Sequence, residues 1–154
     1  MGDCRDKALD LVGRRPHFRR ELQQKLLDRG FPPSEVNDVL EDLARLGLLD
    51  DLQHAQDMAT GYLTRKGFGP RRIRFELRRR GVEEQTAARV VAEVFEDPEE
   101  ELRRARDVAG RKSLRGAFDR DRLARQLDRK GYSKAVILRV LREIGLEQGD
   151  GVDA

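Results

Sequence analysis

"GPRRIRFELRRRGVEEQTAARVVAEV" (Gly69–Val94) is the stretch that decides the fold of this chain. Within it, Ile73 and Leu77 stand four residues apart, and Gly81 follows Leu77 by another four. After Gly81, apolar residues return at helical spacing as far as Val94. An i, i+4 pair before a glycine and i, i+3, i+4, i+7 spacing after it predict a helix, a glycine stop and a second helix.

The same pattern occurs around Gly30 and around Gly131, each about 50 residues from Gly81. All three copies have an aliphatic residue eight positions before the glycine, a leucine four positions before it and an apolar residue directly after it. These residues are Leu22, Leu26 and Phe31; Ile73, Leu77 and Val82; and Leu123, Leu127 and Tyr132. A further helical segment precedes each copy, at residues 6–15, 54–66 and 101–112. The chain is therefore predicted to contain three tandem three-helix repeats.

We accordingly expect an all-α protein in which small repeats are stabilised by their neighbours, giving an elongated, curved molecule. The expected repeats are residues 1–51, 52–97, which is the basic one, and 98–147, followed by a flexible tail at 148–154. Turn and cap signals support these boundaries. They are Gly47, the capping-box pattern of Asp50–Gln53, Pro70, Pro98 and Ser133.

The composition is typical of a helical protein with small apolar cores and a highly charged surface. Of the 154 residues, 38% are hydrophobic and 40% are charged, which fits helices with a narrow buried stripe and a wide charged surface. The formal net charge is only +3, so the distribution of charge says more about partners than the total does. Most basic residues are arginine, which is explained either by genomic composition or by binding of phosphate and carboxylate groups.

The single cysteine, Cys4, excludes an internal disulfide and favours a reducing compartment. The N-terminus has no apolar signal region, and no apolar run approaches the length of a membrane span. We expect a cytoplasmic monomer without membrane contact.

The helix expected before Gly81 carries an unusual density of arginines. Ile73 and Leu77 define its inward face, and Phe75 falls almost opposite them. Arginines surround Phe75 on the outer face and its flank; they are Arg71, Arg72, Arg74, Arg78 and Arg79.

The other two repeats provide an internal comparison. The matching positions are Arg20, Glu21, Gln23, Leu27 and Asp28 in the first repeat, and Asp121, Arg122, Ala124, Asp128 and Arg129 in the third. Those surfaces are mixed, as solvated helices usually are, whereas the second repeat has no acid at these positions.

We therefore predict a binding site for nucleic-acid phosphate or an acidic protein surface. It consists of Arg71, Arg72, Arg74, Phe75, Arg78 and Arg79. Two alternatives stay open: a solvated or internally paired helix face, and packing of Phe75 against a neighbouring repeat.

The sequence offers little for catalysis, and we expect no catalytic, cofactor-binding or metal-binding residues. The two histidines, His17 and His54, fall in different repeats, and a metal site needs a cluster of ligands. Cys4 lies near a terminus expected to be loose and has no evident base beside it. Asp50–Asp51 fits a helix cap better than a carboxylate pair, and Gly67–Gly69 lacks the full nucleotide-loop pattern.

Several motifs resemble the RecX family. They are "LGLLDD" (Leu46–Asp51), Ala55 and "GFGPRRIRFELRRRGV" (Gly67–Val82), with a further similarity at "RRELQQKLLDRG" (Arg19–Gly30). The resemblance extends over roughly residues 6–146; its middle part is the most specific and its third repeat the most divergent. One departure stands at Leu52–Ala55, where the family commonly has an acidic-basic-Phe-Ala run, so the aromatic expected at His54 is missing.

RecX proteins are bacterial regulators of the RecA recombinase with three tandem three-helix repeats. The resemblance implies binding in the groove of the RecA–single-stranded DNA filament, and mainly inhibition of ATP hydrolysis and strand exchange in DNA repair and recombination. Some members also bind DNA.

Two competing functions are a helical DNA-binding protein that acts without RecA and an adaptor for an unrelated acidic protein. Against the first of these, the third helices of the first two repeats carry acid that a groove-reading helix seldom has, such as Glu41, Asp42 and Glu93.

Overall fold

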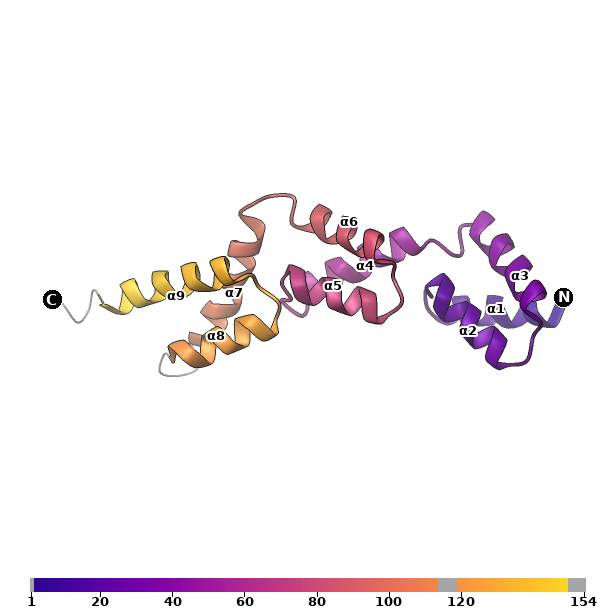
Figure 1. Ribbon diagram of the computed structural model, residues 1–154, viewed down its shortest axis with the longest axis horizontal. Helices are drawn as coiled ribbons and strands as arrows, with labels where there is room; N and C mark the ends of the chain where they lie inside the picture. The colour runs from indigo at the N-terminus through magenta and orange to yellow at the C-terminus, as the bar shows by residue number, and fades with distance from the viewer. Residues whose placement is uncertain (1, 114–118, 150–154) are drawn as a thin grey trace. The chain divides into compact units, whose positions relative to one another are not determined.

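The structure is a computed structural model that describes residues 2–113 and 119–149 (Figure 1). Within these ranges the chain contains helices and no strand, as the all-α prediction requires. The nine helices found there are α1 (Gly2–Arg14), α2 (Arg19–Asp28), α3 (Pro33–Arg45), α4 (Asp51–Thr64), α5 (Pro70–Arg79), α6 (Glu84–Val94), α7 (Glu100–Ser113), α8 (Arg120–Arg129) and α9 (Lys134–Gly149).

The three repeated glycines end α2, α5 and α8 in the same way. Gly30, Gly81 and Gly131 have φ angles of 89°, 97° and 93°, in the left-handed region that glycine enters without a Cβ penalty. In each case the residue after the glycine donates its backbone N–H to the carbonyl of the leucine five residues earlier, as Val82 does to Leu77 at 3.1 Å. The glycine N–H bonds the carbonyl three residues back. This is a Schellman cap, so the predicted glycine stop is confirmed in all three copies.

The chain divides into two compact units, which are described separately. The first unit comprises Met1–Met58 with Leu77–Ala87, and the second comprises Ala59–Glu76 with Ala88–Ala154. The boundaries of the three predicted repeats and the curved, elongated shape stay predictions. Of the predicted tail, Gln148 and Gly149 belong to α9, and residues 150–154 lie outside the described part.

In the first unit, α1, α2 and α3 pack around one apolar core (Figure 1). Leu22 and Leu26 of α2 meet Val36 and Leu40 of α3 in this core, and all four side chains are fully buried. The expectation for Cys4 was wrong: α1 begins at Gly2, and Cys4 is buried in the same core. Burial raises the pKa of its thiol, so Cys4 acts as a small core residue and not as a nucleophile.

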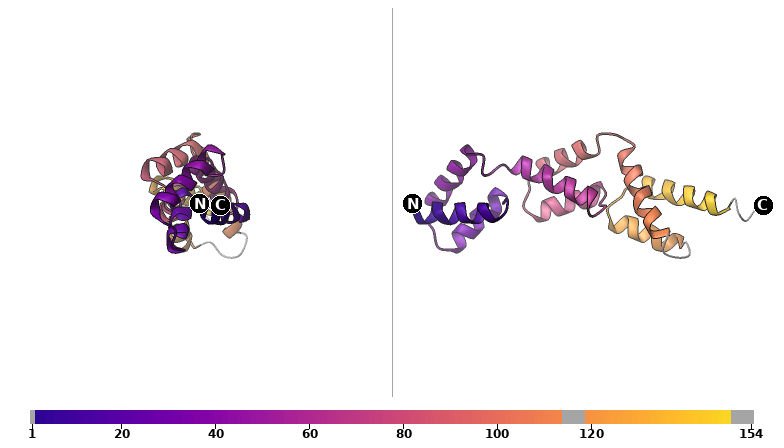
Figure 2. Two further views of the ribbon diagram at one scale, coloured as in Figure 1. Left: turned by 90° about the vertical axis from the view of Figure 1, so that its right-hand side faces the viewer. Right: turned by 180° about the vertical axis from the view of Figure 1, so that it is seen from behind.

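In the second unit, α7, α8 and α9 enclose an equivalent core. The view from behind in Figure 2 shows α7 crossing α9. Leu123 and Leu127 of α8 occupy the places that Leu22 and Leu26 hold in the first unit, and Tyr132 follows the glycine stop with no exposed surface. The same repeat pattern therefore builds both cores.

The second unit also contains a joint in which two backbones touch. We call it the second-unit joint, made by Gly67–Arg72 and Arg129–Tyr132. Gly69 donates its N–H to the Lys130 carbonyl at 2.7 Å, and Arg71 donates its N–H to the Gly131 carbonyl at 3.0 Å. The first-turn amides of α5 thus find partners in the turn between α8 and α9, although such amides have no partner within their own helix.

Two side-chain hydrogen bonds also cross the second-unit joint. The buried Tyr132 hydroxyl donates to the Gly67 carbonyl at 2.6 Å, and burial raises the pKa of this phenol. The Lys130 ammonium donates to the Lys66 carbonyl at 2.7 Å. A Cβ atom added at Gly69 would lie 2.8 Å from the Gly131 backbone, and one added at Gly131 would collide with the Arg72 backbone. Only glycine fits at either position.

We predict that Gly131→Ala destabilises the protein far more than Gly30→Ala does. Both positions have the same left-handed conformation, so each substitution costs about 1–2 kcal/mol in strain. At Gly131 the new methyl group also meets backbone atoms of Arg72, whereas at Gly30 nothing lies within 4 Å. The total at Gly131 should therefore reach about 3–5 kcal/mol.

Urea unfolding of the two variants and the parent chain, followed by circular dichroism, measures this difference. Gly30→Ala is the matched control because it carries the conformational cost alone. Equal losses in the two variants would contradict the close approach of the two backbones.

Candidate functional site

Helix α5 presents the predicted basic face, and the structure gives the members of that face different environments. Its inward residues, Ile73 and Leu77, are fully buried, as the four-residue spacing predicts. Phe75, almost opposite on the helix, has 58% of its surface exposed. Phe75 therefore belongs to neither apolar core, and the alternative in which it packs against a neighbouring repeat stays a prediction. Among the surrounding arginines, Arg72 is half-buried, and the exposed ones are Arg71, Arg74, Arg78 and Arg79.

Arg71 and Arg72 both bind the C-terminal end of α8. The Arg71 guanidinium donates to the Asp128 carbonyl at 2.6 Å and pairs with the Asp128 carboxylate at 2.8 Å. Arg72 donates through Nη1 to the Arg129 carbonyl at 3.0 Å and through Nε to the buried Glu76 carboxylate at 3.0 Å. A cation at a helix C-terminus satisfies its last carbonyls and the negative end of its dipole. These two arginines therefore stabilise the second unit.

The Phe68 ring, which stands between Gly67 and Gly69 in the sequence, packs against three side chains of the second unit. The Arg72 guanidinium lies 4.6 Å from the centre of the Phe68 ring, and the Lys130 ammonium lies 5.7 Å from it. The Tyr62 ring stacks on Phe68 at 5.6 Å. Gly67 and Gly69 let the backbone on either side of this ring reach the turn between α8 and α9. "GFG" is therefore part of the second-unit joint and not a nucleotide loop.

Arg78 lies in the first unit, where it has internal partners as well. Its guanidinium pairs with the Glu84 carboxylate at 3.2 Å and donates to the Val82 carbonyl at 3.1 Å. Both contacts hold the turn between α5 and α6. Arg71, Arg72 and Arg78 thus have structural contacts, which is in keeping with the alternative of an internally paired face.

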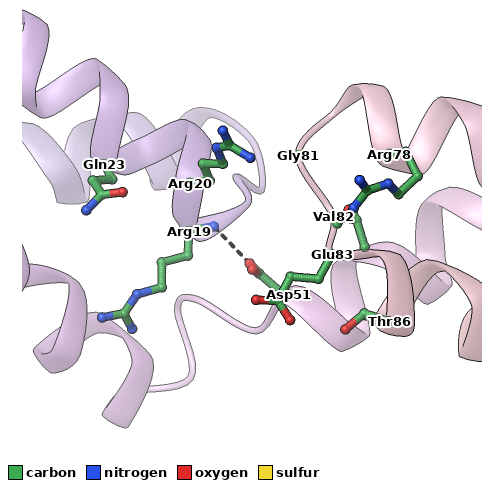
Figure 3. Close-up of a pocket in the computed structure, with 9 residues that line it drawn as sticks. All are labelled: Arg19, Arg20, Gln23, Asp51, Arg78, Gly81, Val82, Glu83 and Thr86. Carbon is green, nitrogen blue, oxygen red and sulfur yellow. Dashed lines mark hydrogen bonds between the residues drawn. The ribbon is translucent and has the colours of Figure 1, made fainter.

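Next to Arg78 is a polar cavity of about 530 Å³, shown in Figure 3. The start of α2, the start of α4 and the α5–α6 turn contribute its walls. The lining residues are Arg19, Arg20, Gln23, Asp51, Arg78, Gly81, Val82, Glu83 and Thr86. Small-molecule sites are mostly apolar, whereas this lining mixes three arginines with two carboxylates and holds a single aliphatic side chain, that of Val82. The cavity offers no evident place for an organic cofactor.

In the first unit, the start of α2 contacts the start of α4 and the α5–α6 turn through side chains. The Asp51 carboxylate accepts the Arg19 N–H at 2.8 Å and so caps α2 from a distant part of the chain (Figure 3). The adjacent Asp50 carboxylate caps α4 itself by accepting the Gln53 N–H at 3.1 Å, as the sequence predicts. Neither aspartate belongs to a carboxylate pair. A Cβ atom at Gly81 would meet only the flexible Arg20 side chain here, at 3.5 Å or more.

His54 fills the place where an aromatic residue was expected. Its imidazole packs on the Phe18 ring with centroids 4.2 Å apart and an interplanar angle of 35°. The imidazole of His54 therefore makes a ring contact at the position where the family pattern has an aromatic residue. Desolvation lowers the pKa of His54 below its ordinary value, which keeps the stacked imidazole neutral.

His17, beside Phe18, is a buried histidine held by two hydrogen bonds. Its Nδ1 lies 3.0 Å from the Arg15 carbonyl, and its Nε2 lies 3.0 Å from the Lys25 ammonium. An ammonium can only donate, so Nε2 accepts from Lys25 and Nδ1–H donates to Arg15. Desolvation lowers the pKa of His17, and a hydrogen bond from Arg15 lowers the pKa of the neighbouring Glu21 carboxyl.

No metal centre is found among the described residues, where no three histidine, cysteine or acidic side chains gather as a ligand set. Within the same part of the chain, every helix is too short or too polar to span a bilayer.

Comparison with known proteins assigns the chain. A family model described as the first three-helix domain of RecX matches residues 4–43, and a model of the second three-helix domain matches residues 50–91. The regulatory protein RecX of Halorhodospira halophila is 46% identical over 134 residues, covering 84% of this chain and 80% of the relative. This chain belongs to the RecX family.

Other RecX proteins support the assignment. That of Pseudomonas fluorescens is 37% identical over 145 residues, covering 93% of this chain and 92% of its own length. The crystal structure of RecX from Lactobacillus salivarius matches with a TM-score of 0.78 at 19% identity, over 94% of this chain and 96% of that one, which shows a shared fold. The RecX relatives are named regulatory proteins, in agreement with the regulatory function predicted from the sequence.

The buried histidine of this RecX-family chain predicts how stability depends on pH. The folded state keeps His17 neutral, whereas the unfolded chain binds a proton below a pH of about 6.5. The unfolding free energy should therefore fall as the pH drops from about 6.5 to about 5.5, by no more than about 1.4 kcal/mol per pH unit for this residue. The Glu21 carboxyl, whose pKa is lowered, stays ionised in this window.

Urea unfolding at several pH values tests this, with His17→Asn as the comparison. Asparagine keeps a donor for the Arg15 carbonyl but cannot titrate, so its stability should depend less on pH between about 6.5 and 5.5. A parent chain equally stable across this window would show that His17 is not held neutral.

Proposed function

We propose that this protein binds the RecA–single-stranded DNA filament and thereby lowers ATP hydrolysis and strand exchange by RecA. Membership of the RecX family carries the proposal, since relatives of similar length are regulatory proteins of that name. Exposure of Phe75 amid arginines on α5 supports it from the structure. The protein would act as a monomer and without a cofactor.

The exposed part of the α5 face is the surface that we assign to binding. Contact between water and an exposed aromatic ring is unfavourable, and burial of the ring in an interface removes that contact. Aromatic residues are therefore frequent anchors of interfaces. Phe75 would be the anchor, and the exposed arginines around it would provide a charged rim. Arg74 and Arg79, both exposed, would contribute positive charge to this rim. Arg71, Arg72 and Arg78 contribute charge while they hold the α8 end and the α5–α6 turn.

The division of the arginines changes how the face should be tested. Replacing Arg71, Arg72 or Arg78 with glutamate would place negative charge beside Asp128, Glu76 or Glu84 and remove hydrogen bonds to backbone carbonyls. Lost binding in such a variant would not separate a partner contact from a weakened fold. Phe75 gives a cleaner test, because its side chain is exposed and supports no core.

The direct experiment measures ATP hydrolysis by RecA on single-stranded DNA with increasing amounts of this protein. A clear drop at substoichiometric amounts is the expected result and would indicate action on filament ends or on nucleation. Unchanged hydrolysis together with binding to bare DNA would favour the competing function, a helical DNA-binding protein that acts without RecA.

We predict that Phe75→Ser raises the amount of protein needed for half-maximal inhibition by about tenfold or more, as expected for loss of an interface anchor. Leu46→Ser is the matched control, because Leu46 is 60% exposed and lies outside α5. Thermal unfolding should be similar for both variants and the parent chain. Equal inhibition by the Phe75 and Leu46 variants would remove α5 from the proposed interface.

A further inference from the structure

Helix α9 has an outer face that the function assigned to α5 does not use. The inward residues of α9 include Ile137, Val140 and Leu141, which are buried in the second core. On the opposite side Leu138 has 51% of its surface exposed. The exposed neighbours of Leu138 on this side carry positive charge or a small side chain; they are Lys134, Ala135, Arg139 and Arg142. We call Lys134, Ala135, Leu138, Arg139 and Arg142 the α9 outer face.

The equivalent helices of the other repeats show that this surface is not a general property of the repeat. Counted from the glycine stop, the matching positions of α3 are Pro33, Ser34, Asn37, Asp38 and Glu41, and those of α6 are Glu84, Gln85, Ala88, Arg89 and Ala92. The α3 positions include two acids and no base, and the α6 positions include one of each. The α9 outer face has three bases, no acid and an apolar centre.

Two acidic side chains near this face have partners. Glu101 of α7 caps α9 by accepting the Ser133 N–H at 2.7 Å. Glu143, the acid on α9 whose side chain is described, accepts two hydrogen bonds from the Arg106 guanidinium of α7, at 2.7 and 2.9 Å. It also lies 3.4 Å from Arg139. The pKa of the Glu143 carboxyl is lowered chiefly by Arg106, so it remains ionised and offsets part of the Arg139 charge. Lys134 and Arg142 are the cations of the face without an ionic partner in the described part of the chain.

The way α8 leads into α9 matches a helix-turn-helix. Four residues, Lys130 to Ser133, join the two helices, and the Gly131 Schellman cap and the buried Tyr132 fix their direction. In that motif the second helix enters the major groove and its N-terminal residues face base edges. The α9 outer face begins at Lys134, the first residue of the helix.

The α9 outer face has no exposed aromatic ring on which bases could stack, which favours duplex over single-stranded nucleic acid. Proteins that bind single strands place bases against exposed aromatic rings. Between residues 119 and 149 the only aromatic residue is Tyr132, which is fully buried and bonded to Gly67. A rigid helix face with cations around an aliphatic side chain suits a duplex, where phosphates flank a groove that displays thymine methyl groups.

We propose that the α9 outer face binds duplex DNA, with Lys134 and Arg142 on backbone phosphates and Leu138 against base edges in the major groove. The inference stands apart from the proposed action on RecA, because it needs no filament. It assigns a duplex site to the second unit in addition to the α5 face.

Fluorescence anisotropy with the full chain and a labelled duplex of about 20 base pairs tests the proposal at about 50–200 mM salt. For the double variant Lys134→Ala/Arg142→Ala, two lost phosphate contacts should flatten the slope of log affinity against log salt by about 2. Affinity at the lowest salt should fall about tenfold or more. Leu138→Ser should weaken binding and leave the slope unchanged, because it removes an uncharged contact.

Arg14→Ala/Arg29→Ala is the matched control, since it removes the same charge from exposed positions of the first unit. Its slope should equal that of the parent chain. The proposal is overturned if the parent chain does not bind the duplex, if both double variants lose affinity equally, or if a single strand binds more tightly through Lys134 and Arg142. Intact duplex binding by Lys134→Ala/Arg142→Ala combined with lost inhibition of RecA would also overturn it, because the face would then contact protein. The result is independent of the Phe75 test, so either proposal can fail alone.

Discussion

The arrangement of the second unit depends on one short stretch of backbone-to-backbone contact. The N–H groups of Gly69 and Arg71 donate to the carbonyls of Lys130 and Gly131, so the first turn of α5 is capped by the turn between two other helices. Such an approach requires that neither backbone carries a Cβ atom at Gly69 or Gly131. A small repeat buries too little apolar surface to stand alone, and hydrogen bonds of this kind join it to a neighbour in a fixed orientation.

The second-unit joint also gives two arginines of α5 a structural role. Because Arg71 and Arg72 come directly after Gly69 and Pro70, the joint places their guanidinium groups at the end of α8, where they satisfy the Asp128 and Arg129 carbonyls. Phe75, one turn further along α5, stays exposed. A run of arginines that looks uniform in the sequence therefore contains residues that also hold the fold. The α1–α3 and α7–α9 groups each enclose an apolar core, and the three glycine caps are alike, whereas the outer surfaces of α5 and α9 carry different chemistry.

The fold could be predicted from the sequence because the repeat fixes both the apolar spacing and the glycine stops. Local rules also gave the Asp50 cap of α4 and the inward direction of Ile73 and Leu77. The contacts of Arg71 with Asp128 and of Arg19 with Asp51 join residues far apart in the chain, and no helical period encodes them. The burial of Cys4 differs from the predicted loose terminus, and its apolar spacing with Ala8 and Leu11 is the signal that indicates a helix with a buried face. The basic face of α9 was not predicted, although the sequence holds a signal for it: at the matching positions α3 has two acids and α6 has one acid and one base.

Native-state hydrogen exchange of the Gly69 and Arg71 amides tests the central claim, that a backbone joint orders the second unit. Amides at the start of a helix ordinarily exchange quickly, because they lack a partner within the helix. If the joint is as described, both amides should be as strongly protected as those in the middle of α8. Exchange as rapid as that of a solvent-exposed helix start would contradict the account.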